Sequence, residues 1–233
     1  MISVKYRYWS RLLGAGAFVG LLAGLYMALV YAPPEATMGD VQRIFYFHLG
    51  SAITAFLAFG VTFVAGLLYL ARRERRWDAI AAASAEIGIV FCSLVLVTGP
   101  LWAKPAWGTW WTWDPRLTTT LVLWLIYVAY LMLRSAMEDP SRRALVSAVF
   151  GTVGFVDVPI VFMSIRWWRT IHPVIVEGGE LNLTPPMVLT LIVAIVAFIT
   201  LYFYLLVERT RLQASEDELE RLKAEHFAER GLT

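Results

Sequence analysis

Six long apolar stretches constrain this chain more than any other feature. The 233 residues are 59% hydrophobic and only 16% charged, against the roughly 25% charged residues of an ordinary soluble domain. A bilayer core about 30 Å thick needs about 20 apolar residues in a helix, because a helix satisfies its own backbone polar groups there. The sequence therefore predicts an all-α, polytopic membrane protein with six transmembrane helices. They cover roughly residues 12–32, 44–71, 79–101, 117–133, 144–165 and 187–207.

The N-terminus superficially resembles a secretory signal, because Lys5, Arg7 and Arg11 precede an apolar run. That run, residues 12–32, is longer than a signal core of roughly 7 to 15 residues, and no small-x-small cleavage site follows it. We therefore expect an uncleaved first span. Gly16, Gly20 and Gly24 form a four-residue stripe along it, which ordinary packing within the bundle explains.

The distribution of lysine and arginine predicts the orientation, because cytoplasmic loops retain an excess of both. Fifteen of the 20 basic residues fall on one side of the six spans, and both termini lie on that side. The other side has five, which are Arg43, Lys104, Arg116, Arg166 and Arg169. Both termini are therefore predicted to be cytoplasmic, and residues 33–43, 102–116 and 166–186 are predicted to be exported.

The composition changes after Val207, where a charged, helix-favouring tail begins. A rough apolar stripe within it is typical of an amphipathic helix. Its members are Leu212, Leu219, Leu222 and Phe227. We expect a six-span domain over residues 1–207 and a cytoplasmic helical tail over residues 208–233.

The segment WAKPAWGTWWTWDPRLT, residues 102–118, holds five of the ten tryptophans within twelve positions. Any single tryptophan here is explained by the aromatic belt at a membrane interface, but five are too dense for a belt alone. If the segment is locally helical, Trp107, Trp110 and Trp111 share one face and form an aromatic shelf for a large flat ligand. Trp113 extends the cluster, whereas Trp102 is the ring that we most expect to face the membrane.

Asp114 and Pro115 close the tryptophan cluster. Asp114 is suited to cap the next helix, with Pro115 at the first helical position. The same carboxylate is also a candidate ligand contact, and the two roles are compatible.

Two histidines fall on the exported side, His48 just inside the second apolar run and His172 in the third exported segment. Either one alone would be explained as a hydrogen-bonded structural residue. Imidazole is a common axial ligand of haem iron, so the pair beside a tryptophan shelf fits a bis-histidine haem. A zinc site normally has three or four ligands, and no third ligand is evident.

Haem carries two propionates, and the arginine fork binds carboxylates in a bidentate manner. Arg43 and Arg116 are the candidates on the exported side, although anchoring of helix ends at the lipid headgroups explains them equally well. Two carboxylates, Glu86 and Asp157, lie within spans, and we assign neither a function. No catalytic motif is visible, and a net charge of +2 gives no reason to expect a nucleic-acid partner.

The sequence WGTWWTWDPRLT closely resembles the tryptophan-rich (WWD) motif of the cytochrome c maturation protein C family. The similarity extends through VTGPLWAKPAWGTWWTWDPRLT, through RIFYFH around His48, and through VPIVFMSIRWWRTIH around His172. These motifs cover the three exported regions, and the six-span plan matches over nearly the whole chain. One departure follows the first histidine, where the family often has a proline and this chain reads Leu49-Gly50-Ser51.

The resemblance implies a haem-binding chaperone, not an enzyme, in the bacterial cytoplasmic (inner) membrane. Such a protein holds haem b non-covalently and transiently at the outer face and presents it to a periplasmic haem chaperone during c-type cytochrome biogenesis. The family works with the ATPase and membrane subunits of an ABC transporter and with a small single-span subunit. The axial ligands would be His48 and His172. The porphyrin contacts would be Trp107, Trp110, Trp111, Trp113 and Asp114.

Two other functions remain open on the residues alone. A transmembrane b-type redox cytochrome would use the same haem for electron transfer, but it would favour histidines deeper in the spans. A structural subunit of a transporter would use the tryptophans only as interface anchors, and it would bind no haem.

Overall fold

The computed structural model describes residues 4–172, 176–177, 180–181 and 183–229. The described chain is mostly helical, and its only strands are two of two residues each that pair antiparallel. Its elements are α1 (Val4–Tyr26), the π-helix η1 (Met27–Tyr31), the 3-10 helix η2 (Asp40–Gln42), α2 (Arg43–Arg72), α3 (Arg75–Trp107), α4 (Pro115–Ser135), α5 (Pro140–Gly154), α6 (Asp157–Trp167), β1 (Val176–Glu177), β2 (Glu180–Leu181) and α7 (Pro185–Glu229).

Six helical segments in the described chain are long and apolar enough to cross a membrane, which confirms the predicted all-α, six-span fold. The fourth, predicted over residues 117–133, runs over Pro115–Ser135 and is 21 residues long. The third continues to Trp107, although the sequence suggested an end near residue 101. Pro100 and Pro105 lie inside that helix, which transmembrane helices tolerate because neighbouring groups satisfy the freed carbonyls.

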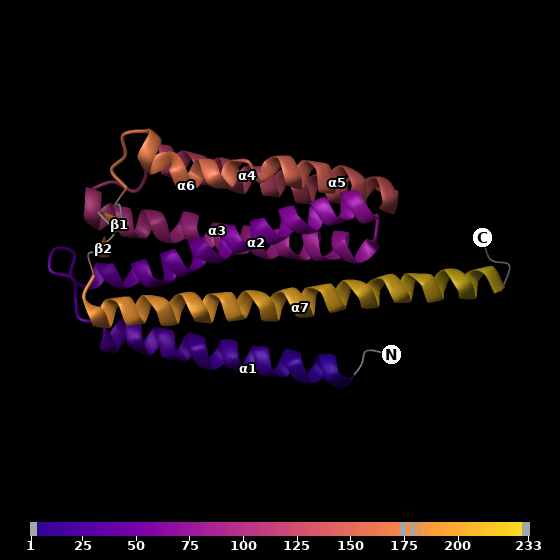
Figure 1. The fold of residues 1–233 in the computed structure, drawn as a ribbon, viewed down its shortest axis with the longest axis horizontal. Coiled ribbons are helices and arrows are strands. Elements are labelled where there is room, and N and C mark those ends of the chain that lie inside the picture. Colours follow the sequence, from indigo (N-terminus) through magenta and orange to yellow (C-terminus); the bar gives the residue numbers. More distant parts are fainter. Residues whose placement is uncertain (1–3, 173–175, 178–179, 182, 230–233) are drawn as a thin grey trace.

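The helices form three groups, with the α2–α3 pair between α1 and α7 on one side and α4, α5 and α6 on the other (Figure 1). α2 is central, because it packs against α3, α5 and α7. Both termini lie at one end of the bundle, which we call the terminal end (Figure 1). The segments that join α1 to α2 and α3 to α4 gather at the opposite end, together with β1 and β2 between α6 and α7 (Figure 1). The three segments predicted to be exported therefore share one end, and its orientation in the membrane stays a prediction.

The glycine stripe of α1 packs against α7. A Cβ atom added to Gly20 would lie 3.2 Å from the Cβ of Ala197, and one on Gly24 would lie 3.7 Å from the Cα of Ala194. Close approach of the two backbones therefore explains the stripe, in agreement with its interpretation as ordinary packing.

The fifth span, predicted as one apolar stretch over residues 144–165, is broken into two helices. α5 ends at Gly154 and α6 begins at Asp157, so that residues 155–156 separate them. Pro159 lies in the first turn of α6, where its missing N–H breaks no helical hydrogen bond. The Asp157 carboxylate lies at a helix N-terminus, where negative charge is favourable.

α7 continues without interruption through Val207, so the predicted boundary there is a change of composition and not of secondary structure. Its Arg209 binds Glu86 of α3 with two hydrogen bonds, of 2.6 Å from Nε and 3.1 Å from Nη2. Glu86, to which we assigned no function from the sequence, thus joins two helices near the terminal end. The division into a six-span domain and a tail remains a prediction.

A second bidentate ion pair joins α4 to the start of α3 at the same end. Arg134 donates from Nη1 to Oδ1 of Asp78 at 2.6 Å and from Nη2 to Oδ2 at 3.0 Å. The Arg134 residue is only 8% exposed. Truncating one partner of such a pair would leave a buried charge uncompensated.

Candidate functional site

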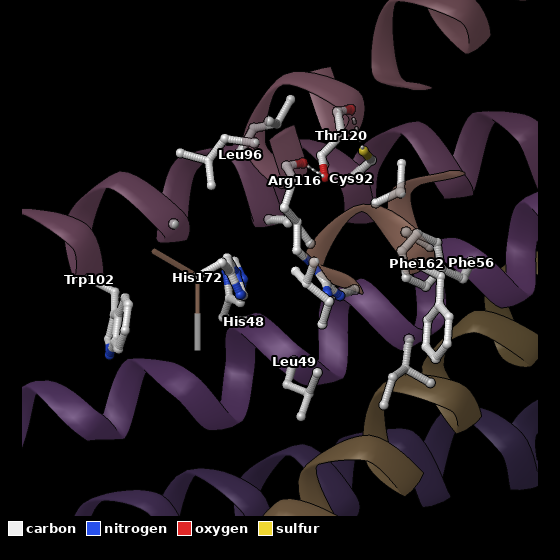
Figure 2. A pocket seen from close by; sticks show the side chains of 18 of the residues that line it. His48, Leu49, Phe56, Cys92, Leu96, Trp102, Arg116, Thr120, Phe162 and His172 are labelled. Atoms are coloured by element: carbon white, nitrogen blue, oxygen red, sulfur yellow. Dashed lines mark hydrogen bonds between the residues drawn. The ribbon is translucent and has the colours of Figure 1, made fainter. Parts of the chain in front are cut away.

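A cavity of about 450 Å³ lies between α2, α3, α4, α6 and α7 (Figure 2). Its helical lining comes from the first halves of α2, α4 and α7, the second half of α3 and the part of α6 from Val161 onward, which places it toward the end opposite the termini (Figure 1). Its volume lies within the roughly 300–1,000 Å³ that is usual for small-molecule and cofactor sites. We call this region the cavity end. Its wall is mostly apolar and includes Phe45, Leu49, Ile53, Phe56, Leu96, Leu117, Leu123, Val161, Phe162, Leu191 and Ile195.

The two predicted histidines both line this cavity, and Figure 2 shows their imidazole rings at its centre. His48 belongs to the second turn of α2, whereas His172 lies five residues after the last residue of α6. The Nδ1 atom of His48 is 2.9 Å from Oγ1 of Thr98 on α3. The fold thus brings together two histidines from distant parts of the sequence. The sequence analysis had placed both of them on the exported side of the spans.

The tryptophans are arranged differently from the predicted helical shelf. α3 ends at Trp107, and Gly108 adopts a left-handed conformation with φ of 75°. Its N–H donates to the Lys104 carbonyl at 2.9 Å, which is a common helix ending. Residues 109–114 that follow are not helical, so the spacing that would have aligned three rings on one face does not apply.

Trp102, Trp107 and Trp111 line the cavity, whereas Trp110 and Trp113 do not and are 55% and 75% exposed. The sequence interpretation of Trp102 as a membrane-facing ring is therefore wrong. The rings of Trp102 and Trp107 meet edge to face with centroids 5.2 Å apart, and Trp107 meets the ring of His172 at 6.3 Å. These rings form a continuous aromatic wall beside the histidines.

Asp114 caps α4, as predicted, and also holds the segment that carries His172. Its Oδ1 accepts a hydrogen bond of 3.0 Å from the backbone N–H of Arg116 at the start of the helix. Its Oδ2 accepts from the Thr170 hydroxyl at 2.7 Å and from the Ile171 N–H at 3.0 Å. The residue is only 8% exposed. One buried carboxylate therefore joins the tryptophan motif to the loop before His172.

The two predicted arginines differ in position. Arg116 lines the cavity, but Arg43 does not. The Arg43 guanidinium instead donates to Oδ1 of Asp40 at 2.8 Å and to the Ala28 carbonyl at 2.6 Å, which joins η1 to the start of α2. Arg166, which the sequence analysis counted only among the five basic residues of the exported side, lines the cavity as well. Its only signal in the sequence is its position six residues before His172.

The ligand set of the cavity suits a flat, metal-bearing molecule better than a bare metal ion. Among the described residues, no group of three or more His, Cys, Asp or Glu side chains could hold a metal ion. Two imidazoles meet the needs of haem iron, which takes four further nitrogen ligands from its own porphyrin. Flat aromatic walls fit the macrocycle, and guanidinium groups fit its carboxylates. The residues present therefore fit a haem.

Comparisons with known proteins also point to haem. The sequence model of the family "Heme exporter protein C" matches residues 2–225. A heme exporter protein C of Haemophilus influenzae is 33% identical over 226 residues, which cover 93% of this chain and 90% of that relative. One of Bradyrhizobium diazoefficiens is 36% identical over 192 residues, covering 82% and 73%.

A more distant source gives a similar match. A Marchantia polymorpha protein named "Putative cytochrome c biosynthesis ccmC-like mitochondrial protein" is 31% identical over 208 residues, which cover 88% of each chain. The family match spans nearly the whole chain, and it includes all three regions that build the cavity end. The chain belongs to the heme exporter protein C family.

Proposed function

We propose that this protein binds haem b non-covalently and transiently, with His48 and His172 as the axial ligands of the iron. One observation carries the proposal: two histidines from distant segments share a single apolar cavity that is walled by aromatic rings. The names of the relatives support haem as the cargo. A bound haem would supply the iron that the two imidazoles ligate, and the chain's residues would hold and orient it.

The charges around the cavity suggest the orientation of the macrocycle. Arg116 and Arg166 are the cations that line it, and arginine binds carboxylates with a matching planar fork. We assign the propionates to these two residues, in place of Arg43, whose guanidinium has other partners. The apolar edge of the macrocycle would then face the apolar part of the wall, which includes Phe56 and Phe162.

The proposed role is transfer, not catalysis. The cavity lies at the end where three connecting segments gather, and Trp110 and Trp113 are exposed there. The excess of basic residues at the terminal end supports an orientation with the cavity end on the outer, periplasmic side of the inner membrane. The protein would present haem there to a periplasmic haem chaperone during cytochrome c biogenesis. An ABC transporter and a small single-span subunit are its proposed assembly partners.

The experiment uses the full chain, purified in detergent from cells with abundant haem. We expect a Soret absorbance band in the isolated protein, and a shift of that band to the acceptor when a haem-free periplasmic haem chaperone is added. Protein that shows no Soret band and takes up no added haemin would contradict haem binding. Haem that stays on the protein in the presence of excess acceptor would contradict the transfer role.

A further inference from the structure

Thr98 contacts the proposed iron ligand His48 from outside the cavity. Its Oγ1 lies 2.9 Å from Nδ1 of the imidazole, and Thr98 is not itself part of the cavity wall. The same hydroxyl oxygen lies 2.6 Å from the carbonyl oxygen of Leu94, one turn earlier in α3. Thr98 therefore stands between a helix carbonyl and the histidine ring.

The positions of these three atoms determine where the protons lie. A threonine hydroxyl has one hydrogen to donate, and a backbone carbonyl can only accept. The short distance to Leu94 requires that hydrogen, because otherwise two oxygen lone pairs would face each other at 2.6 Å. Oγ1 of Thr98 is then an acceptor toward the ring, so Nδ1 of His48 must carry a hydrogen.

We propose that Thr98 is the positioning residue that fixes His48 in its Nδ1–H tautomer and leaves the Nε2 lone pair for the haem iron. This inference rests on the proposed function. A neutral imidazole has one protonated nitrogen, so a proton on Nδ1 leaves Nε2 as the only possible ligand atom. The hydrogen bond also orients the ring and makes the imidazole a stronger electron donor, as outer contacts of metal-bound histidines do.

The test compares variants of the full chain in detergent. Thr98→Val and Thr98→Ala remove the acceptor, whereas Thr98→Ser retains it. Loss of such an outer contact typically weakens binding by about 10- to 100-fold, so we expect haemin to dissociate that much more readily from the Val and Ala variants. Thr98→Ser should restore the wild-type affinity.

A matched control separates the ligand effect from a loss of helix structure. The Thr200 hydroxyl makes the same one-turn bond, to the Val196 carbonyl at 2.7 Å, on α7 and away from the cavity. Thr200→Val should therefore leave the haemin affinity unchanged. A second readout is the midpoint potential of the bound haem, which should rise in Thr98→Val because a weaker donor stabilises ferric iron less. A merely structural role would not shift this potential.

The outcomes distinguish this inference from the proposed function. If Thr98→Val and Thr98→Ala bind haemin with the affinity and midpoint potential of Thr98→Ser, the positioning role is wrong, even if His48→Ala abolishes binding. If the wild-type protein binds no haemin, the proposed function itself fails. If Thr98→Val does not fold, Thr98→Ala carries the same expectation.

Discussion

The two ends of the bundle use their arginines differently. Near the terminal end, Arg134 and Arg209 each form a bidentate pair with a carboxylate of α3. At the cavity end, neither Arg116 nor Arg166 forms an ion pair with any residue that the structure describes. Charges within a membrane protein are costly unless they are paired or line a polar site. The comparison shows that Arg134 and Arg209 join helices through carboxylates, whereas Arg116 and Arg166 line the cavity, where we propose that they bind a ligand.

The largest effect is expected at the terminal end. Asp78→Ala would leave Arg134 buried without its partner, which typically costs about 3–5 kcal/mol of folding free energy. We expect a marked loss of thermal stability in detergent, with an unchanged haem spectrum in the protein that remains folded. Adding Arg134→Met should recover much of that stability, because the orphaned charge is removed. If Asp78→Ala alone were as stable as the wild type, the Arg134–Asp78 pair would not stabilise the packing of α4 on α3.

Arg116→Gln should produce the opposite pattern at the cavity end. A hydrogen bond to a charged group contributes about 1.5–3 kcal/mol, which corresponds to a loss of haem affinity of about 10- to 100-fold. Thermal stability should change little, because no described ion pair is lost. Arg43→Gln is the matched control and should retain the affinity, since its guanidinium binds Asp40 and the Ala28 carbonyl. A haemin titration in which only Arg43→Gln lost affinity would reverse the assignment.

Asp114→Ala should lower both the thermal stability and the haem affinity moderately. Loss of a helix cap typically costs about 0.5–2 kcal/mol, and the segment before His172 would lose two hydrogen bonds at the same time. We expect a lower unfolding temperature together with weaker haem binding. Thr170→Val, which removes one of these bonds and keeps the cap, should weaken haem binding with a smaller change in unfolding temperature. Full haem affinity in Asp114→Ala would mean that the carboxylate serves the helix alone.

The smallest expected effect is on haem affinity, and it distinguishes Trp102 from Trp113. Trp102→Ala removes a ring from the cavity wall, and an aromatic contact contributes about 0.5–1.5 kcal/mol beyond its buried area. We therefore expect haem affinity to fall by roughly two- to tenfold. Trp113→Ala removes a ring that is 75% exposed and outside the wall, so the affinity should be retained. If Trp113→Ala lost affinity and Trp102→Ala retained it, the sequence interpretation of these two residues would be correct.

The fold was largely predictable because its main determinant is local. Each span needs only a run of apolar residues of sufficient length, and the six predicted runs correspond to the six observed segments. The break in the fifth span has a local signal, because Pro159 cannot donate to the carbonyl of Phe155 and its ring would clash with that carbonyl in a continuous helix. The packing beside the break was not predictable. At Gly154, a Cβ atom would lie only 2.6 Å from Cγ2 of Ile126 in α4. Such a close approach leaves no trace in the pattern of apolar residues.

The site was predictable in its composition but not in its geometry. His48, His172 and Arg116 could be grouped because topology places them at one end. Which tryptophans face inward depends on where α3 ends, and that depends on the left-handed Gly108. Arg166 was missed for a related reason, since it lies in the last turn of α6 and only the packing of that turn brings it to the cavity. Periodicity predicts faces of regular helices, and this site is built where the helices end.

Ligation of one haem by His48 and His172 is the central claim, and electron paramagnetic resonance of the ferric complex tests it most directly. The measurement uses the full chain loaded with haemin, as wild type, His48→Ala and His172→Ala. We predict the low-spin signal of two imidazole ligands in the wild type and its loss, with a high-spin signal or no bound haem, in each variant. An unchanged low-spin signal in either variant would contradict the account.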